Sequence, residues 1–86
     1  MNQTIYSAQA EILTKHIRKL RKEAGITQRE LAKLLEREHS MIARIELGER
    51  RLDLVECFWL FKALGCDPVQ EVSVLMKRIA NSVPEP

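Results

Sequence analysis

The chain has 86 residues, which is the length of one small domain with a modest core. Its composition is 45% hydrophobic and 30% charged with few glycines and prolines, which excludes a disordered chain. No apolar run approaches the ~20 residues of a membrane span. The N-terminal residues lack the basic start and long apolar block of a signal peptide, so we expect a cytoplasmic protein.

Charge is unevenly distributed along the chain, although the net charge is only +2. Residues 15–51 carry eleven basic and six acidic side chains, whereas the remainder carries three basic and six acidic ones. A basic segment of this kind indicates a surface for a polyanion such as DNA. Charge runs on helices are also commonly solvated faces, and basic residues favour the C-terminal end of a helix, so the pattern is a weak signal on its own.

The sequence does not place cysteines, histidines or carboxylates at the spacings that an enzyme or a metal site needs. Cys57 and Cys66 have neither CxxC spacing nor a histidine pair, so we expect two reduced thiols at a helical core and its edge. His16 has no partner at catalytic or metal-ligand spacing, so we expect it on a helix surface. We find no nucleophile–base set, paired-carboxylate site or phosphate loop, and therefore expect no catalysis, metal or cofactor.

The hydrophobic pattern predicts an all-α chain of five helices. The first covers about residues 7–24, where apolar residues recur at three- and four-residue steps, and Gly25 ends it. The second begins at Thr27, whose hydroxyl forms a capping box with Glu30, and ends near residue 35 or 36. Its expected inward side chains are Leu31, Ala32, Leu34 and Leu35.

The third helix follows a short polar turn formed by Glu36, Arg37 and Glu38. It covers about residues 39–47, and Gly48 ends it. The side chains that we expect to point inward are Ile42 and Ile45. The side chains that we expect on the outer face are His39, Ser40, Met41, Ala43 and Arg44.

The last two helices also have recognisable starts. Asp53 and Glu56 resemble a second capping box, and Gly65 ends the fourth helix. Its expected core positions are Val55, Phe58, Phe61 and Leu64. The fifth helix covers about residues 68–81, with Asp67 as its N-cap and Pro68 as its first residue. Its apolar side consists of Val69, Val72, Leu75, Met76 and Ile79. Residues 82–86, with two prolines, form an expected flexible tail.

Two helices of about eight residues joined by a three-residue turn are typical of a helix-turn-helix. In that motif the first helix crosses the DNA backbone, and the second enters the major groove with its N-terminal residues near base edges. The second helix must therefore have a polar outer face and an apolar inner face. The predicted third helix, about residues 39–47, has both.

The sequence resembles a Cro/C1-type, or XRE-family, helix-turn-helix protein, and in particular small single-domain members, many of them prophage-like regulators. The segments that carry the resemblance are IRKLRKEAGITQRELAKLL at 17–35, SMIARIELGERRLDLVE at 40–56 and ALGCDP at 63–68. The resemblance implies a lambda-repressor-like five-helix domain over residues 1–86, with its core at about 7–68. It also implies that helices two and three form the motif.

The resemblance assigns roles to individual residues. Gln28 matches a glutamine that binds a phosphate and braces the recognition helix, and Arg44 matches a base-reading position. Arg21 and Glu46 match a structural salt bridge. Met41 would lie against a thymine methyl, and Arg50 and Arg51 would contact the DNA backbone or the minor groove. The full set expected at DNA is Gln28, Arg29, Arg37, His39, Ser40, Met41, Arg44, Arg50 and Arg51.

The turn departs from the family pattern, which has glycine, then an apolar or basic residue, then serine or threonine. Here Glu36 replaces the glycine, at a cost that depends on whether this residue needs a positive φ. Glu38 replaces the N-cap hydroxyl and brings an acid close to DNA, where it would accept from a cytosine amino group or repel phosphate. His39 stands where glutamine is common, which predicts an unusual operator.

An exposed tryptophan is rare on a monomer surface, and Val55, Phe58, Phe61 and Leu64 already supply a core stripe. We therefore expect Trp59 to contribute to a subunit contact with the fifth helix, although it could instead cover the edge of the core. The expected interface consists of Trp59, Val72, Leu75, Met76 and Ile79.

The expected function is a DNA-binding transcriptional regulator, most simply a repressor, that acts on nucleoid DNA. One recognition helix reads too few bases, so we expect a homodimer on an inverted repeat of double-stranded DNA. The alternatives are an antitoxin that also binds a toxin, a controller protein of a restriction–modification system, and a protein-interaction module that has lost DNA binding.

Overall fold

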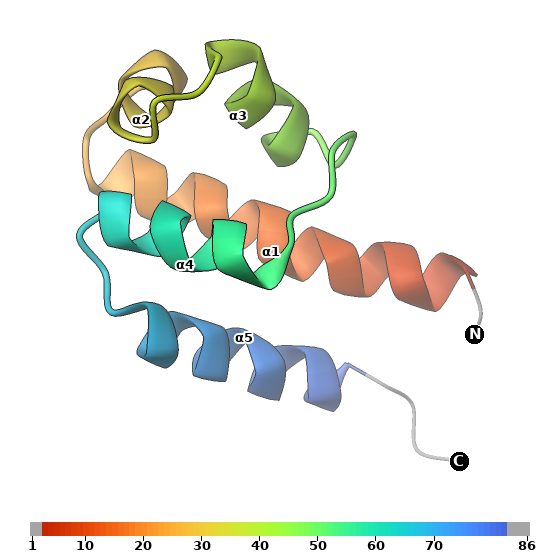
Figure 1. Ribbon diagram of the computed structural model, residues 1–86. Coiled ribbons are helices and arrows are strands. Elements are labelled where there is room, and N and C mark those ends of the chain that lie inside the picture. The colour runs from red at the N-terminus through yellow and green to blue at the C-terminus, as the bar shows by residue number, and fades with distance from the viewer. Residues whose placement is uncertain (1–2, 83–86) are drawn as a thin grey trace.

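The computed structural model describes the backbone of residues 3–82 and the side chains from residue 6 onward. Five helices follow one another within this range, and it contains no strand (Figure 1). The helices are α1 (Gln3–Glu23), α2 (Gln28–Leu34), α3 (His39–Glu46), α4 (Leu54–Ala63) and α5 (Pro68–Asn81). The predicted all-α, five-helix class is confirmed. Helix α1 begins four residues earlier than the sequence pattern indicated.

The helices are arranged around α1. In Figure 1, α2 and α3 lie at the top, α5 lies at the bottom, and α1 and α4 run between them. Helix α1 contacts both α3 and α5, while α2 pairs with α3 and α4 pairs with α5. The N-terminal part of α1 extends beyond the other helices, and the longest dimension of the molecule is 44 Å. The α2–α3 pair is therefore held at one side of the domain.

One hydrophobic core receives side chains from every helix. The largest side chains that it buries completely are Phe61, Ile17, Leu31, Ile42, Ile45 and Leu60. Each removes a Leu- or Phe-sized apolar surface from water, worth about 1.5–3 kcal/mol. The inward positions predicted for α3, Ile42 and Ile45, are thus confirmed, and so is Leu31 of α2. Leu34 of α2 is not part of this core, because its side chain is 61% exposed.

The helix starts agree with the sequence. The Thr27 hydroxyl accepts from the Glu30 amide, and the Glu30 carboxylate accepts from the Thr27 amide, which completes the predicted capping box. Asp53 and Glu56 form the second box at the start of α4. At α5, Asp67 is the N-cap and a proline occupies the first turn, as expected. Of the expected tail, only Ser82, the C-cap of α5, is described.

The inward face of α4 was predicted wrongly. Val55 and Phe58 were expected in the core, but both are exposed, and Cys57 and Leu60 are buried in their place. Phe61 and Leu64 are buried as expected. The reason is that α4 is apolar on nearly every side, so its pattern does not select one face. Cys57 and Cys66 are free thiols, as expected, and burial raises the pKa of the Cys57 thiol.

His16 was expected on the surface and is instead buried, with 9% of its side chain exposed. Its Nε2 lies 2.7 Å from the Glu71 carboxylate of α5, and its ring lies edge-on to Phe61 at a centroid distance of 6.3 Å. A polar group inside a core requires such a partner. The contact joins α1 to α5 across 55 positions of sequence, which local periodicity cannot indicate.

Candidate nucleic-acid interface

Helices α2 and α3 form a helix-turn-helix whose inner sides close the core. Leu31 and Ala32 of α2 are buried against the same cluster as Ile42 and Ile45 of α3. The two helices are in direct contact, and four residues, 35–38, connect them. The packing fixes the angle between them, and the remaining face of α3 is turned outward.

The C-terminal end of α3 is held by Glu46. Its carboxylate accepts from Arg21 of α1 at two points, Nε at 2.7 Å and Nη2 at 2.9 Å, and from Gln28 of α2 at 3.0 Å. A third arginine nitrogen, Nη1, donates to the Ile26 carbonyl in the α1–α2 loop at 2.9 Å. The expected Arg21–Glu46 pair is therefore formed, and it joins three helices through one side chain.

The charge state of this network is fixed by its hydrogen bonds. Burial alone would raise the pKa of the Glu46 carboxyl, because only 4% of its side chain is exposed. The hydrogen bonds from Arg21 and Gln28 outweigh burial and hold this pKa below its ordinary value. The same hydrogen bond raises the pKa of Arg21. Both groups are ionised at neutral pH, which makes the contact a charge-assisted, two-point pair.

Gln28 is placed between the recognition helix and the start of α2. Its amide nitrogen is committed to Glu46 through one N–H, so a second N–H and the carbonyl oxygen remain. It borders a shallow hollow at the junction of α1, α2 and the start of α3, together with Lys22, Thr27, Arg29 and His39. This hollow has the charge and the donors that a phosphate group needs.

The outer face of α3 carries the expected polar residues. His39, Ser40 and Arg44 are exposed, and Arg44 forms no ion pair with any side chain that the structure describes. Met41 differs from the prediction, because it is half-buried and packs against the core. The freely accessible positions of α3 are therefore three polar side chains.

The turn before α3 is strained and incompletely capped. Glu36 has φ of +55°, in the left-handed region, where side chains other than glycine are disfavoured. Glu38 occupies the N-cap position of α3 but makes no side-chain hydrogen bond there. Both departures from the family pattern thus have a structural consequence at the end of α3 that faces outward.

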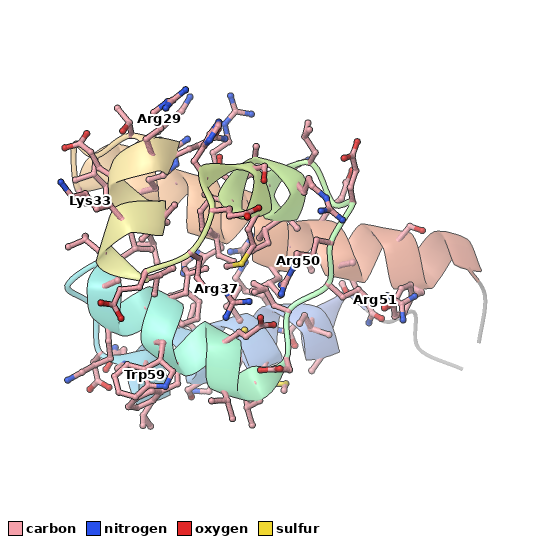
Figure 2. The ribbon with its side chains drawn as sticks, turned by 45° about the horizontal axis from the view of Figure 1, so that its top comes forward. Arg29, Lys33, Arg37, Arg50, Arg51 and Trp59 are labelled. Atoms are coloured by element: carbon pink, nitrogen blue, oxygen red, sulfur yellow. The ribbon has the colours of Figure 1, made fainter. Side chains whose placement is uncertain are left out.

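Arg50 and Arg51, in the loop after α3, make different contacts. Arg50 donates to the Glu56 carboxylate of α4, with Nη2 at 2.7 Å and Nη1 at 3.3 Å. Arg51 is exposed, and its guanidinium lies 5.2 Å from the centroid of the Tyr6 ring. Arg37 of the turn also lies 3.7 Å from the Glu56 carboxylate. Figure 2 shows Arg37 and Arg50 between the helix-turn-helix and α4, and Arg51 apart from them, beside α1.

The comparisons with known proteins agree with this geometry. A helix-turn-helix family model matches residues 17–70, which is more than half of the chain. The chain belongs to the XRE helix-turn-helix family. Its structure is similar to that of an XRE-family like protein from Pseudomonas syringae pv. tomato str. DC3000, with 34% sequence identity and a TM-score of 0.78. The match covers 95% of each chain. No curated protein matches the sequence.

Membership of the XRE family indicates a DNA-binding regulator of transcription, and this family is typically not enzymatic. The exposed face of α3 and the exposed Arg29 of α2 (Figure 2) fit that role. Within residues 3–82 no helix is long and apolar enough to cross a membrane.

The expected subunit surface is only partly available in this XRE-family domain. Trp59 is 58% exposed and stacks edge-on against Phe58 at 5.0 Å between ring centroids. Met76 is exposed, whereas Val72 and Ile79 are half-buried. The prediction of Leu75 as an interface residue is wrong, because its side chain is 4% exposed and belongs to the domain's own core. Helix α5 turns this residue toward the other helices.

The sequence did not indicate the partners of three site residues, Arg37, Arg50 and Arg51. Glu56 was identified as a capping residue, but not as the acceptor for Arg50 and Arg37. The contact of Arg51 with Tyr6 was also missed. The spacing of Arg50 and Glu56, six residues across a loop and the first turn of a helix, is the one local signal that could have indicated their pairing.

Proposed function

We propose that this XRE-family protein is a sequence-specific regulator of transcription that binds double-stranded nucleoid DNA as a homodimer on an inverted repeat. The observation that carries the proposal is the exposed polar face of α3, whose angle is held by the Glu46 network. Base-edge recognition needs a helix that is polar outside and fixed inside. The bound protein would act most simply as a repressor by occupying the operator.

Arg44 is the residue proposed to read a base. It is exposed, lies on the outer face of α3 and forms no ion pair with any side chain that the structure describes. Its planar fork matches the two acceptors of a guanine edge, a contact worth about 1–3 kcal/mol of discrimination. His39 and Ser40 lie on the same face, nearer the N-terminal end that enters the groove.

Phosphate contacts are proposed for Gln28, Arg29 and Arg51, which flank α3 on its two sides. Such contacts supply affinity without sequence information, and they make binding fall steeply as salt is added. Arg37 is half-exposed and only loosely paired, so it is available for the same role. Met41 is proposed as an apolar contact at the edge of the face rather than its centre.

Dimerisation is proposed through α4 and α5. The large apolar side chains exposed there are Leu54, Val55, Phe58, Trp59, Val69, Val74 and Met76. Exposed apolar side chains of this size are typical of the centre of a subunit interface. A second copy is favoured as the occupant because two recognition helices are needed for a specific site.

The test is selection of binding sites from random duplex DNA, followed by affinity measurements on the selected site at several salt concentrations. We expect a palindromic site and a steep loss of affinity with salt. Arg44→Ala should weaken specific binding by about 1–3 kcal/mol and relax one position of each half-site. Lys77→Ala, which removes an equal charge from α5, is the control. Selection that enriches no sequence would refute the proposal and favour a protein-interaction module.

The dimer is tested by sedimentation of the free protein. Trp59→Ala should raise the dimer dissociation constant about tenfold or more, because buried tryptophans dominate interfaces of this kind. Leu34→Ala, which removes an exposed apolar side chain from α2, should leave it unchanged. A wild-type protein that sediments as a monomer and binds a toxin through this surface would instead identify an antitoxin.

A further inference from the structure

Glu56 carries more contacts than its capping role requires. Its carboxylate accepts from the Asp53 amide at 3.0 Å, which completes the capping box of α4. The same carboxylate accepts from two nitrogens of Arg50, at 2.7 and 3.3 Å. Side chains of this pair are 25% and 22% exposed, so water competes with the contact only in part. The result is a charge-assisted two-point pair between the loop and α4.

Arg50 in turn shapes the backbone around the residues proposed to touch DNA. Its Nη1 also donates to the Arg51 carbonyl at 3.0 Å. The amides of Glu49 and Arg50 donate to the Arg44 carbonyl at 2.8 and 3.3 Å, so the loop is folded onto the end of α3. Three hydrogen bonds thus hold the guanidinium against the protein, and moving it outward to a phosphate would break them.

The segment before α3 is tied to the same carboxylate. Arg37 of the turn lies 3.7 Å from Glu56, as a looser and more exposed contact than that of Arg50. One acidic side chain of α4 therefore holds the segments on both sides of α3, one firmly and one weakly. Hydrogen bonds from Arg50 and from the Asp53 backbone lower the pKa of the Glu56 carboxyl, which keeps it ionised.

We propose that Glu56 is a positioning residue for DNA recognition. It holds Arg50 in a structural role, as a strut that supports the loop, so that Arg50 does not contact phosphate. Through Arg50 it fixes the conformation of the loop that follows α3 and that carries Arg51. This inference rests on the proposed DNA-binding function. The opposite role is an intramolecular stand-in for phosphate, in which Glu56 occupies two arginines that DNA would otherwise take.

The two roles predict opposite results for Glu56→Gln. Glutamine at this position keeps an amide oxygen for the Asp53 amide, so the helix start is retained. It removes the charge that holds Arg50. Glu30→Gln is the matched control, because it makes the same change in the capping box of α2, whose carboxylate has no arginine partner among the residues that the structure describes. Both variants raise the net charge by one.

The measurements are the affinities of the full chain for the selected duplex and for a scrambled duplex, each at several salt concentrations. We expect Glu56→Gln to lower the ratio of specific to non-specific affinity about tenfold relative to Glu30→Gln. The dependence of binding on salt should be the same in both variants, because no phosphate contact is gained. A mere loss of stability would lower both affinities by the same factor and leave the ratio unchanged.

Arg50→Gln supplies the second arm. If Arg50 acts as a strut, this variant lowers the ratio of specific to non-specific affinity by the same factor as Glu56→Gln. The double variant then lowers the ratio no further than either single variant. The proposal is overturned if Glu56→Gln binds the selected site more tightly with a salt slope steeper by about one. It is also overturned if Arg50→Gln lowers specific and non-specific affinity equally. A wild-type chain that binds neither duplex refutes the proposed function itself.

Discussion

The two ends of α3 are built in opposite ways. At the C-terminal end, the Glu46 carboxylate receives three hydrogen bonds from α1 and α2. Gly48 then takes φ of +77°, a conformation that glycine adopts without strain. At the N-terminal end, Glu38 makes no side-chain cap and Glu36 has φ of +55°. One end is satisfied throughout, whereas the other keeps strain and an unused capping position.

The contrast indicates that one end of α3 fixes the angle of the helix and that the other end is free to differ in what it recognises. A helix whose C-terminal half is fixed by buried groups keeps its angle when its first turn is altered. Strain that persists at an outward-facing turn is characteristic of functional positions. We infer that the Glu46 end sets how α3 enters the groove, and that the turn at Glu36–Glu38 can vary with the DNA that is read.

Breaking the satisfied end should have the largest effect. Glu46→Gln removes the charge opposite Arg21 and leaves a nearly buried guanidinium without its partner, at a cost of about 3 kcal/mol of unfolding free energy. Urea denaturation followed by circular dichroism measures this loss. Glu49→Gln, three residues away and exposed, is the control and should change stability by less than about 0.5 kcal/mol. Equal losses in both variants would contradict the comparison.

The same end should respond to acid. Because the pKa of Glu46 is lower in the folded chain than its ordinary value near 4.5, the unfolded chain takes up this proton first as pH falls. The stabilisation is complete above about pH 4.5 and is lost as pH falls through the folded-state pKa. As the pH is lowered from 5, the free energy of unfolding of the wild-type protein should therefore fall more than that of Glu46→Gln. Parallel curves for the two proteins would show that another group is responsible.

Helix starts could be predicted from the sequence because capping is local. Thr27, Asp53 and Asp67 each lie within three residues of the amide that they cap. The inward face of α4 could not be predicted, because an apolar helix offers several equivalent faces and only packing selects one. Val55 and Phe58 were therefore placed in the core, and Leu60 was not.

The candidate site divides in the same manner. The Arg21–Glu46 pair was expected only because the sequence resembles a known family, since 25 positions separate its members. The partner of His16 lies 55 positions away and no family motif indicated it, so the residue was assigned to the surface. The outer face of α3 followed from helical spacing alone, apart from Met41, which leans onto the core.

Adding the missing side-chain cap at the N-terminal end of α3 should change stability less than the loss of the Glu46 charge does. Glu38→Ser supplies a hydroxyl that accepts from an amide in the first turn of α3, and we expect a gain of about 1 kcal/mol. Glu38→Ala removes the same charge without adding an acceptor, and it should give no gain. If alanine and serine stabilise equally, the effect comes from charge rather than capping.

Relieving the strain at Glu36 should have the smallest effect on stability. A side chain in the left-handed region costs about 1 kcal/mol or more, and Glu36→Gly removes that cost. Glycine also adds freedom to the unfolded chain, which offsets about 0.4–1 kcal/mol of the benefit. The expected net gain is about 0.5 kcal/mol. Glu36→Ala removes the same carboxylate but keeps the Cβ atom and its strain, so it should be no more stable than the wild type.

The two variants at Glu36 also separate the effect of strain from the effect of charge at the proposed DNA surface. Both lose the carboxylate of a residue that borders the same hollow as Ser40 and Arg44, so an effect of charge on DNA affinity should appear equally in the two. An effect of the backbone should appear only in the glycine variant. If glycine is less stable than alanine, residue 36 is not strained, and the contrast between the two ends of α3 rests on the missing cap alone.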